Sequence, residues 1–511
     1  MSIGEKASQG FFSFLTRNII SRFMGLISLF ILARKLSPFD FGLVSFTDIL
    51  LMFIAVFGST GLNEFLIAYK KDDYLQILKA SFWFNCIITL GVIFLFFTFI
   101  PFWASSKNDS RIINLAFISG LIFFITQLQI IPKAILSRNL DFKTTVKIQN
   151  PFIIIIPIAK IIAALSGFGV YSLTVPTLIF LPIQTIWYYR AVSWKFEWKL
   201  YTDRWKEIYH FTKHLIGNSL LTRLMDDGDK LFLSSFIGLK ALGVYNMAYQ
   251  LSSFVGLNIV SLTGSILVSV LPKYRDNLSQ MKSHYLNFTK VLAFFTFPII
   301  AIMACYAEPL IIAINGEKWV DAVIPFQILS LYAMIRAVTS SRGAVLNTLH
   351  LNKNVFKLNL IYTPIHIAFS IIFSYYSGLI GLAVSVVILR IVFATIGAND
   401  TMKSMNGSLY EFIYSLKTPA KIVFYTSFLC LLTMYLIPSS SFKNFIISFE
   451  ILFLNKFVSF IYITFLILFS IVYFTLLVRY IFKNEIIDIS LFIKNSNKKV
   501  GNMFEKVFIT N

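Results

Sequence analysis

The sequence predicts an all-α polytopic membrane protein with about fourteen transmembrane helices. Hydrophobic residues make up 57% of its 511 residues, and the mean hydropathy is +0.75. Charged residues make up only 14%, against about 25% in an average soluble domain. Apolar windows of about 20 residues, the length that crosses a bilayer as a helix, recur along the chain. A soluble core of this size could not bury all 55 phenylalanines, so a soluble globular class is excluded.

The apolar windows set the limits of each predicted helix in chain order. They lie at residues 11–33, 42–68, 77–102, 112–136, 145–166, 169–189, 208–237, 241–270, 288–314, 323–348, 355–376, 378–399, 419–438 and 457–482. Another apolar segment, residues 442–454, lies between the last two windows, so the exact limits of that pair stay open.

The distribution of Lys and Arg predicts which loops face the cytoplasm. With the N-terminus inside, even-numbered loops hold most of the basic residues, such as Lys133, Arg138 and Lys199, and the basic tail adds more. Odd-numbered loops hold few, such as Lys107 and Arg111. Because basic residues gather on the cytoplasmic side, both termini are predicted to be cytoplasmic. The net charge of +21 is then explained by basic residues that face anionic membrane lipids. Nucleic acid is excluded as a partner because the sequence has no basic stripe interleaved with exposed aromatic residues.

An internal repeat predicts two related halves. The segment SRFM at Ser21–Met24 is similar to TRLM at Thr222–Met225, 201 residues later, and Gly42 matches Gly243 at the same offset. SGFGVYSL at 166–173 resembles SGLIGLAV at 377–384 further on. Several matches in one order favour two pseudo-symmetric six-helix lobes with parallel topology, as in alternating-access transporters. The alternative is that similar apolar compositions produce a false repeat.

The predicted domain boundaries follow from this repeat. An N-lobe is expected at residues 1–190, a C-lobe at 207–400, and a C-terminal helix pair with a basic cytoplasmic tail at 401–511. Residues 191–206 join the lobes, and on a helix Trp194, Trp198 and Trp205 would share one face. That composition predicts an amphipathic linker lying along the cytoplasmic interface.

Charged residues inside the predicted spans are the candidate functional site, because such groups face a bundle interior or a water-filled cavity. In the span 208–237, Arg223, Asp226, Asp227 and Lys230 follow helical spacing and lie on one face, whereas Asp229 points elsewhere. Arg22 in the first span matches Arg223. Facing arginines suit an anionic ligand, because guanidinium is always protonated and fits phosphate oxygens. The alternative is an ion-paired seam that holds the lobes together.

Other residues extend this candidate site. The predicted substrate-binding residues are Arg22, Arg223, Arg17 and Lys230; the coupling or ion-pair residues are Asp226, Asp227, Asp229 and Glu64; and the secondary cavity residues are Lys160, Arg336 and Arg342. The sequence predicts no cofactor, no metal site and no enzyme, because it has no phosphate-binding loop, HExxH motif or nucleophile elbow. The three cysteines are widely spaced and each lies in an apolar run, as packing residues do.

The N-terminal run FFSFLTRNIISRFMGLISLFILARKLSPFDFGLVSF resembles bacterial polysaccharide flippases of the Wzx type. These proteins belong to the multidrug/oligosaccharidyl-lipid/polysaccharide (MOP) exporter superfamily. Their LAR-x-LSP-x-DFG signature is matched by Leu32–Gly42. A second family motif, an acidic residue followed by an apolar run and a glycine, is matched by Asp229 through Gly238. Two later pieces are matched by Ala307–Leu310 and Gly316–Trp319.

The resemblance implies fourteen helices in two lobes around a central charged cavity. It also implies movement of undecaprenyl-diphosphate-linked oligosaccharide between leaflets of the bacterial cytoplasmic (inner) membrane, for O-antigen or exopolysaccharide synthesis. The expected partners are this glycan, membrane lipids, and polymerase and chain-length proteins of the same pathway, with a monomeric transporter. Arg22 and Arg223 would attract the diphosphate, and Asp226, Asp227 or Asp229 would couple transport to protons. The alternatives are a drug/cation antiporter on the same scaffold and a membrane-embedded polymerase or ligase.

Overall fold

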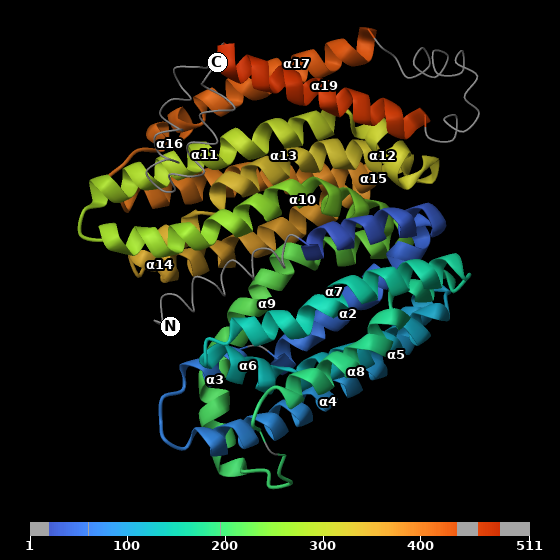
Figure 1. Cartoon of the computed structure of the whole chain (residues 1–511), viewed down its shortest axis with the longest axis vertical. Helices are drawn as coiled ribbons and strands as arrows, with labels where there is room; N and C mark the ends of the chain where they lie inside the picture. The colour runs from blue at the N-terminus through green and yellow to red at the C-terminus, as the bar shows by residue number, and fades with distance from the viewer. Residues whose placement is uncertain (1–19, 60, 195, 437–457, 481–511) are drawn as a thin grey trace. The chain divides into compact units, whose positions relative to one another are not determined.

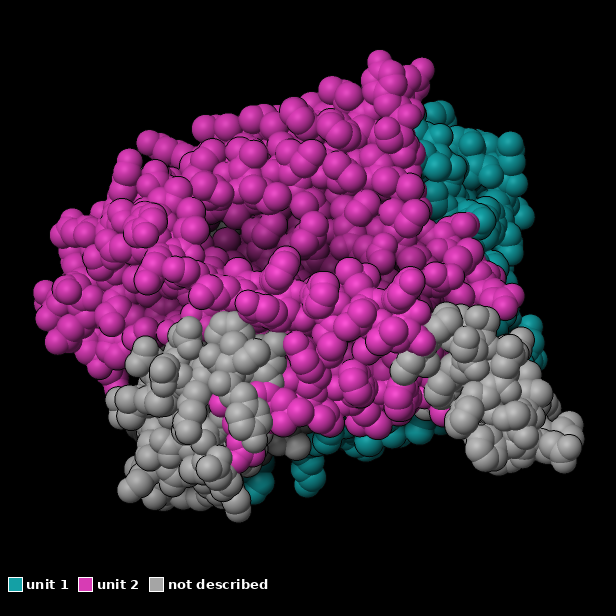
Figure 2. Space-filling model, turned by 90° about the horizontal axis from the view of Figure 1, so that it is seen from above, with its two compact units in different colours: residues 1–244 teal, residues 245–511 magenta. Residues whose placement is uncertain are grey.

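The computed structural model describes residues 20–59, 61–194, 196–436 and 458–480 (Figure 1). These ranges form helices joined by turns, and they contain no strand. The chain divides into two compact units, residues 1–244 and residues 245–511 (Figure 2). Each unit is described separately below.

Unit 1 is built from long apolar helices that cover nearly every predicted span of its part of the chain. Residues 20–35 form the first helix. The elements that follow are α2 (Pro38–Ser59), α3 (Leu62–Ala68), α4 (Tyr74–Lys107), α5 (Arg111–Leu128), α6 (Ile130–Arg138), α7 (Phe142–Leu165), η1 (Gly169–Leu173), α8 (Val175–Arg190), η2 (Thr202–Arg204), α9 (Trp205–Phe236) and the start of α10 (Leu239–Val270). Helix α2 lies at the centre and packs against α4, α5 and α9.

Unit 2 contains the rest of α10 and the helices that follow. They are η3 (Leu271–Tyr274), α11 (Leu278–Cys305), α12 (Ala307–Asn315), η4 (Glu317–Ala322), α13 (Val323–Thr339), α14 (Arg342–Thr348), α15 (Asn352–Lys403), α16 (Leu409–Ser415), α17 (Lys417–Leu436) and α19 (Val458–Tyr480). Helix α13 packs against α11 and α15, and α17 packs against α11 and α19. The buried Tyr306 hydroxyl lies 2.8 Å from Thr433 Oγ1 of α17 and 3.0 Å from Ser470 Oγ of α19. The C-terminal helix pair is therefore joined to unit 2 by a polar contact.

The prediction of an all-helical, multi-pass membrane protein is confirmed. Within the described ranges, nine helices are long and apolar enough to cross a membrane. One of them, α15, consists of two helices that meet at a non-helical residue, Gly378, where φ is 59°; they correspond to the eleventh and twelfth predicted spans. Helix α9 is as long as its neighbours but carries more charge. The count of fourteen and the two six-helix lobes stay predictions.

The boundary between the compact units lies later than the predicted lobe boundary. Helix α9 was expected to open the C-lobe at residue 207, but it groups with unit 1. The physical reason is that α9 packs along α2, α3 and α4. At its C-terminal end, Lys107 Nζ of α4 also donates a hydrogen bond to the Ser234 carbonyl oxygen of α9 at 2.5 Å.

The prediction placed three tryptophans of the linker, residues 191–206, on one face of a helix. The described residues of the linker do not form that helix. Its described residues are turns and irregular chain up to η2, and α9 begins at Trp205. The aromatic rings pack differently as a result. Trp194 and Trp205 pack against a buried cluster of α3, α4 and α6, whereas Trp198 is 81% exposed.

Ion pairs hold this linker to the loop that precedes α4. Arg204 Nη2 lies 2.7 Å from Asp73 Oδ2, and Lys71 Nζ lies 2.7 Å from Glu207 Oε1. The Tyr69 hydroxyl donates to Asp73 Oδ1 at 2.7 Å. This hydrogen bond, followed by the nearby Arg204, lowers the pKa of Asp73 below its ordinary value.

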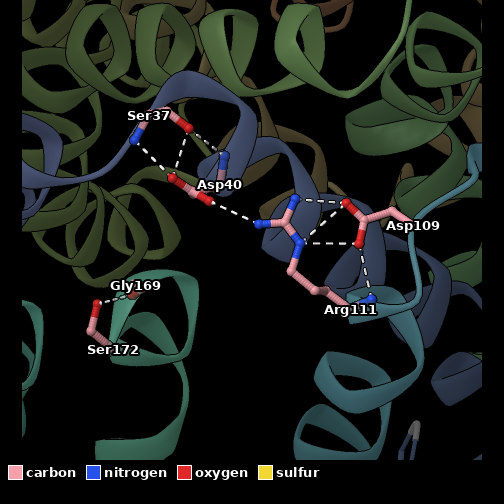
Figure 3. A network of polar contacts seen from close by, with 6 residues as sticks. All are labelled: Ser37, Asp40, Asp109, Arg111, Gly169 and Ser172. Carbon is pink, nitrogen blue, oxygen red and sulfur yellow. Dashed lines mark hydrogen bonds and ion pairs between the residues drawn. The ribbon is translucent and has the colours of Figure 1, made fainter. Parts of the chain in front are cut away.

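The LSP-x-DFG part of the signature forms the start of α2 (Figure 3). Ser37 Oγ and Ser37 N both donate to Asp40 Oδ2, at 2.7 and 2.9 Å, and Asp40 N donates back to Ser37 Oγ at 3.2 Å. This reciprocal arrangement satisfies donors that a helix start leaves unpaired. Arg111 Nη1 lies 3.7 Å from Asp40 Oδ1, while Arg111 also binds Asp109 through two nitrogens. The signature therefore caps α2 and connects it to the start of α5.

The glycine of the signature lies where α2 crosses the start of α10. A Cβ added to Gly42 would lie 1.8 Å from the Leu239 carbonyl oxygen, and a Cβ added to Gly243 would lie 1.8 Å from the Pro38 carbonyl oxygen. Pro38 and Leu239 are related by the same 201-residue offset as the two glycines. The two helix starts thus meet in a reciprocal contact of backbone against backbone, for which only glycine leaves room.

Candidate functional site

The charged face of α9 contains opposite charges that lie within ion-pair distance at helical spacing. Lys230 Nζ lies 2.5 Å from Asp227 Oδ1, one helical turn away. Arg223 Nη1 lies 3.9 Å from Asp227 Oδ2. Lys230 is 7% exposed and Asp229 is 4% exposed. Asp229 Oδ1 accepts a hydrogen bond from the Lys230 backbone N–H at 2.9 Å.

Arg223 differs from the other charges of this face because its side chain is 45% exposed. Its Nη1 lies 3.9 Å from Met52 Sδ of α2. Met52 and Asp48, one turn apart, are the exposed residues in the middle of α2, whereas Thr47 and Ile49 on either side of Asp48 are buried. Arg223 therefore extends to an exposed stripe of α2.

Asp48 is the residue of this stripe that the sequence analysis did not include. Ser119 Oγ of α5 donates to Asp48 Oδ1 at 3.0 Å, and Ser119 is 4% exposed. Lys160 of α7 acts on Asp48 electrostatically without making a direct ion pair. An acidic residue inside the predicted span 42–68 was a signal for it, since charged groups in spans seldom face lipid.

Lys160, predicted as a secondary cavity residue, thus lies near a carboxylate that no sequence motif pointed to. Side chains of two helices, Ser119 of α5 and Arg223 of α9, contact one stripe of α2. Because a charge facing hydrocarbon costs several kcal/mol, we expect this stripe to face polar surroundings rather than lipid. We call Asp48, Met52, Ser119 and Arg223 the α2 stripe site.

The remaining predicted residues of unit 1 are placed as follows. Arg22 lies on the first described helix and is half-buried. Glu64 is exposed in the first turn of α3, a helix separated from α2 by Gly61, which has a φ of 89°. Arg17 and the side chain of Asp226 lie outside the residues that the structure describes.

Arg336 and Arg342, the predicted residues of unit 2, lie with a third arginine, Arg390. Arg336 Nη1 donates to the Tyr249 hydroxyl at 2.5 Å, and Arg336 and Arg390 lie 6.0 and 5.5 Å from the centre of one Tyr332 ring. Arg342 lies against Gly397, where a Cβ would meet its Nη1 at 2.5 Å. These cations are half-buried. Figure 2 shows a recess in the face of unit 2 turned to the viewer.

Among the described residues, no group of three or more His, Cys, Asp and Glu side chains could hold a metal ion. Cys86, Cys305 and Cys430 are free thiols.

Comparison with known proteins places this site in a family. Residues 31–324, more than half of the chain, match the family described as "Polysaccharide biosynthesis protein". The chain is 24% identical over 291 residues to the teichuronic acid biosynthesis protein TuaB of Bacillus subtilis, and this match spans 54% of the chain and 58% of TuaB. It is 21% identical over 452 residues to the lipopolysaccharide biosynthesis protein WzxC of Escherichia coli, covering 85% and 88% of the two chains.

Solved structures share the fold. A lipid II flippase, MurJ, in an inward closed conformation has a TM-score of 0.66 at 16% sequence identity, covering 84% of this chain and 99% of MurJ. An inward-facing multidrug resistance transporter of the MATE family, within the MOP superfamily, has a TM-score of 0.60 at 14% identity, covering 77% and 98%. The family match and the sequence relatives confirm the resemblance found in the sequence. The chain belongs to the polysaccharide biosynthesis protein family and has the fold of MOP-superfamily transporters.

Proposed function

We propose that the protein is a flippase that moves undecaprenyl-diphosphate-linked oligosaccharide units from the inner to the outer leaflet of a bacterial cytoplasmic membrane. The observation that carries the proposal is the α2 stripe site, a polar and charged surface inside an apolar bundle of a polysaccharide biosynthesis family member. A hydrophilic glycan needs such a surface to cross the hydrocarbon core, whereas its polyprenyl tail remains in lipid.

Arg223 and Arg22 are proposed to hold the diphosphate. Arg223 is suited because its side chain is exposed and its nearest carboxylate oxygen is 3.9 Å away, so its guanidinium has nitrogens to offer to a ligand. Lys230 is less suited, because it is buried and paired with Asp227 at 2.5 Å. Arg17 and Asp226 remain sequence-based predictions. Alternating access of two lobes, both termini in the cytoplasm and a monomeric transporter are part of the proposal.

The acidic residues of α9 are proposed to position Arg223 and Lys230. Asp227 contacts both cations, and Asp229 is buried, so each is already committed within its own helix. Proton coupling by Asp227 or Asp229, which the sequence allowed, would require breaking these contacts. Glu64 is exposed at a helix start, where its charge interacts with the helix dipole.

The test compares a strain in which the gene for this protein is deleted with strains that carry two variants of the protein. Deletion is expected to trap lipid-linked repeat units in the inner leaflet, where an impermeant oxidant of sugars cannot reach them. The Arg22→Ala/Arg223→Ala variant should reproduce that accumulation at normal protein level. Lys240→Ala, at the exposed start of α10, serves as the control and should export normally. Normal export by the double variant would rule out the diphosphate role of these arginines.

The second candidate is a drug or cation antiporter, favoured by the fold shared with a MATE transporter and by the acidic side chains in the spans. Under this candidate, deletion would raise sensitivity to lipophilic cations and leave surface polysaccharide intact. The flippase proposal expects the reverse pair of phenotypes.

A further inference from the structure

Two of the three cysteines meet inside unit 2, although they lie far apart in the sequence. Cys305 is the last residue of α11, and Cys430 lies in the second half of α17. Both are free thiols, and they form a hydrogen bond with each other. Cys430 is fully buried and Cys305 is half-buried. The sequence indicated only packing roles, because the spacing of cysteines along a chain does not record a contact between distant helices.

Contacts on either side of the two thiols align them with each other. Ser427, one turn before Cys430 on α17, forms a hydrogen bond with the Cys305 thiol. Thr433 Oγ1, one turn after Cys430, lies 2.8 Å from the hydroxyl of Tyr306, the residue that follows Cys305. Residues three apart on a helix share one face, so Cys430 lies between these two contacts. The pair is therefore aligned by its neighbours as well as by its own hydrogen bond.

We propose that Cys305 and Cys430 are a redox-active dithiol, and that its oxidation to a disulfide links α11 covalently to α17 and stabilises unit 2. The β-carbons of a disulfide lie about 3.5–4.5 Å apart. Side chains whose sulfurs already touch reach that spacing with a small shift. Cys305 can make this shift because it ends α11, and Tyr306 after it has left the helical conformation.

The oxidant that fits this position is a lipid-soluble quinone, because both sulfurs lie in membrane-spanning helices. In the reaction the S–H bonds of both cysteines break and one S–S bond forms. The two electrons and two protons pass to the carbonyl oxygens of the quinone, which becomes a quinol. A dithiol reductant reverses the step by exchange through a mixed disulfide. Cys305 is the sulfur that such reagents meet first, since it is the more exposed of the two.

A disulfide suits this pair better than a metal ion. Structural zinc takes four ligands, drawn from Cys, His, Asp and Glu. Across the described ranges, three or more such side chains nowhere come together in a way that could hold a metal ion. The other polar groups beside the pair are hydroxyls, such as Ser470 Oγ, which lies 3.5 Å from Cys430 Sγ. Two sulfurs with hydroxyl neighbours can form a disulfide without any further ligand.

The first experiment maps the bond in the full-length protein in liposomes. The reduced protein is treated with duroquinone, whose fully substituted ring favours oxidation of thiols over addition to them, and in a separate sample with diamide. Remaining thiols are then blocked and the peptides are mapped. A disulfide between the peptides of Cys305 and Cys430 is expected, and dithiothreitol should release it. Cys86 of α4, in unit 1, is the internal control and should stay a thiol.

Trypsin digestion gives an independent measurement of the same bond. Lys403 and Lys417 are exposed on either side of α16, so cleavage after them separates α17 from α11. On a denaturing gel without reductant, the fragments that contain these two helices should stay linked after oxidation and separate after reduction. Cys305→Ser and Cys430→Ser should each abolish the link, whereas Cys86→Ser should retain it.

Free thiols at Cys305 and Cys430 with both oxidants, while glutathione added with the diamide is fully oxidised, overturn the proposal. A disulfide that includes Cys86 instead overturns it as well. Since the wild-type protein carries this measurement, a folding defect in a variant cannot hide the result. The outcome does not depend on what the protein transports, so it stands apart from the test of the flippase proposal.

The second experiment measures what the bond does to unit 2. Oxidised and reduced wild-type protein are compared by thermal scans in the same detergent. The oxidised protein should melt several degrees higher, because a cross-link between residues far apart in the sequence restricts the unfolded chain. The oxidants should leave the melting temperature of Cys430→Ser unchanged. Equal melting temperatures of reduced and fully linked wild-type protein overturn the stabilising role.

Discussion

Lys230 and Asp227 show at the scale of single residues why charges are tolerated inside this bundle. Each side chain is largely buried, and the two lie one turn apart on α9 with 2.5 Å between Nζ and Oδ1. Removing one partner leaves the other as an uncompensated charge, which in buried pairs costs about 3–5 kcal/mol. Removing both avoids that cost.

We therefore expect Lys230→Met to lower the apparent melting temperature in detergent by several degrees, and Lys230→Met/Asp227→Leu to lower it less. Thermal scans of the single and double variants, analysed as a double-mutant cycle, measure the coupling. If Asp227 serves only to position its neighbours, the double variant also keeps part of the export activity. Complete loss in a well-folded double variant would contradict the positioning role.

Asp73 provides a second test at the residue scale, through pH. The hydrogen bond from Tyr69 and then the charge of Arg204 lower the pKa of Asp73 from its ordinary 3.8. A carboxyl whose pKa is lowered on folding stabilises the fold above its unfolded pKa, and that stabilisation is lost as the pH falls through the folded value. The melting temperature should thus fall on acidification below about pH 4, and fall less in Tyr69→Phe. Asp72→Asn, at the exposed neighbouring residue, is the control and should behave like wild type.

At the scale of elements, the start of α2 combines the cap of Ser37 and Asp40 with the close crossing at Gly42. Both glycines of the crossing face a carbonyl oxygen of the other helix, and an added Cβ would lie 1.8 Å from it. The helices cannot accommodate a methyl group without moving apart, since interiors are closely packed.

Gly42→Ala and Gly243→Ala are therefore each expected to destabilise the protein, by about 1–3 kcal/mol if the helices shift, and to reduce export. Gly25→Ala and Gly91→Ala are matched controls, because nothing lies within 4 Å of an added Cβ at these helical positions. Both controls should match or exceed the wild-type melting temperature, since alanine favours a helix over glycine. Equal melting temperatures of all four variants would show that α2 and the start of α10 can move apart without loss of stability.

At the scale of the whole molecule, the asymmetry of basic residues predicts the orientation in the membrane. Both termini are expected in the cytoplasm, so a C-terminal green fluorescent protein should fluoresce and a C-terminal alkaline phosphatase should be inactive. Alkaline phosphatase inserted after Asn108, between α4 and α5, should be active. The reverse pattern would invert the proposed direction of transport. An active phosphatase at both places would contradict the odd number of spans predicted between them.

Much of the architecture and part of the site could be predicted, because they depend on local features. Helix positions follow from apolar windows, and the pairing of Asp227 with Lys230 follows from helical spacing alone. The linker was misjudged because its tryptophans were placed on an assumed helix, whereas contacts with α3, α4 and α6 hold Trp194 and Trp205 in irregular chain. Asp48 went unnoticed because its meaning depends on Ser119 and Lys160, which are far away in the sequence.

By itself the sequence determined that this protein is helical, spans a membrane and carries charges inside its spans, since hydropathy and helical period are properties of consecutive residues. Only the tertiary structure decided which of those charges neutralise one another and which remain accessible. Side chains from α5 and α9 reach the same stripe of α2 through packing between distant segments, and no local pattern records that convergence.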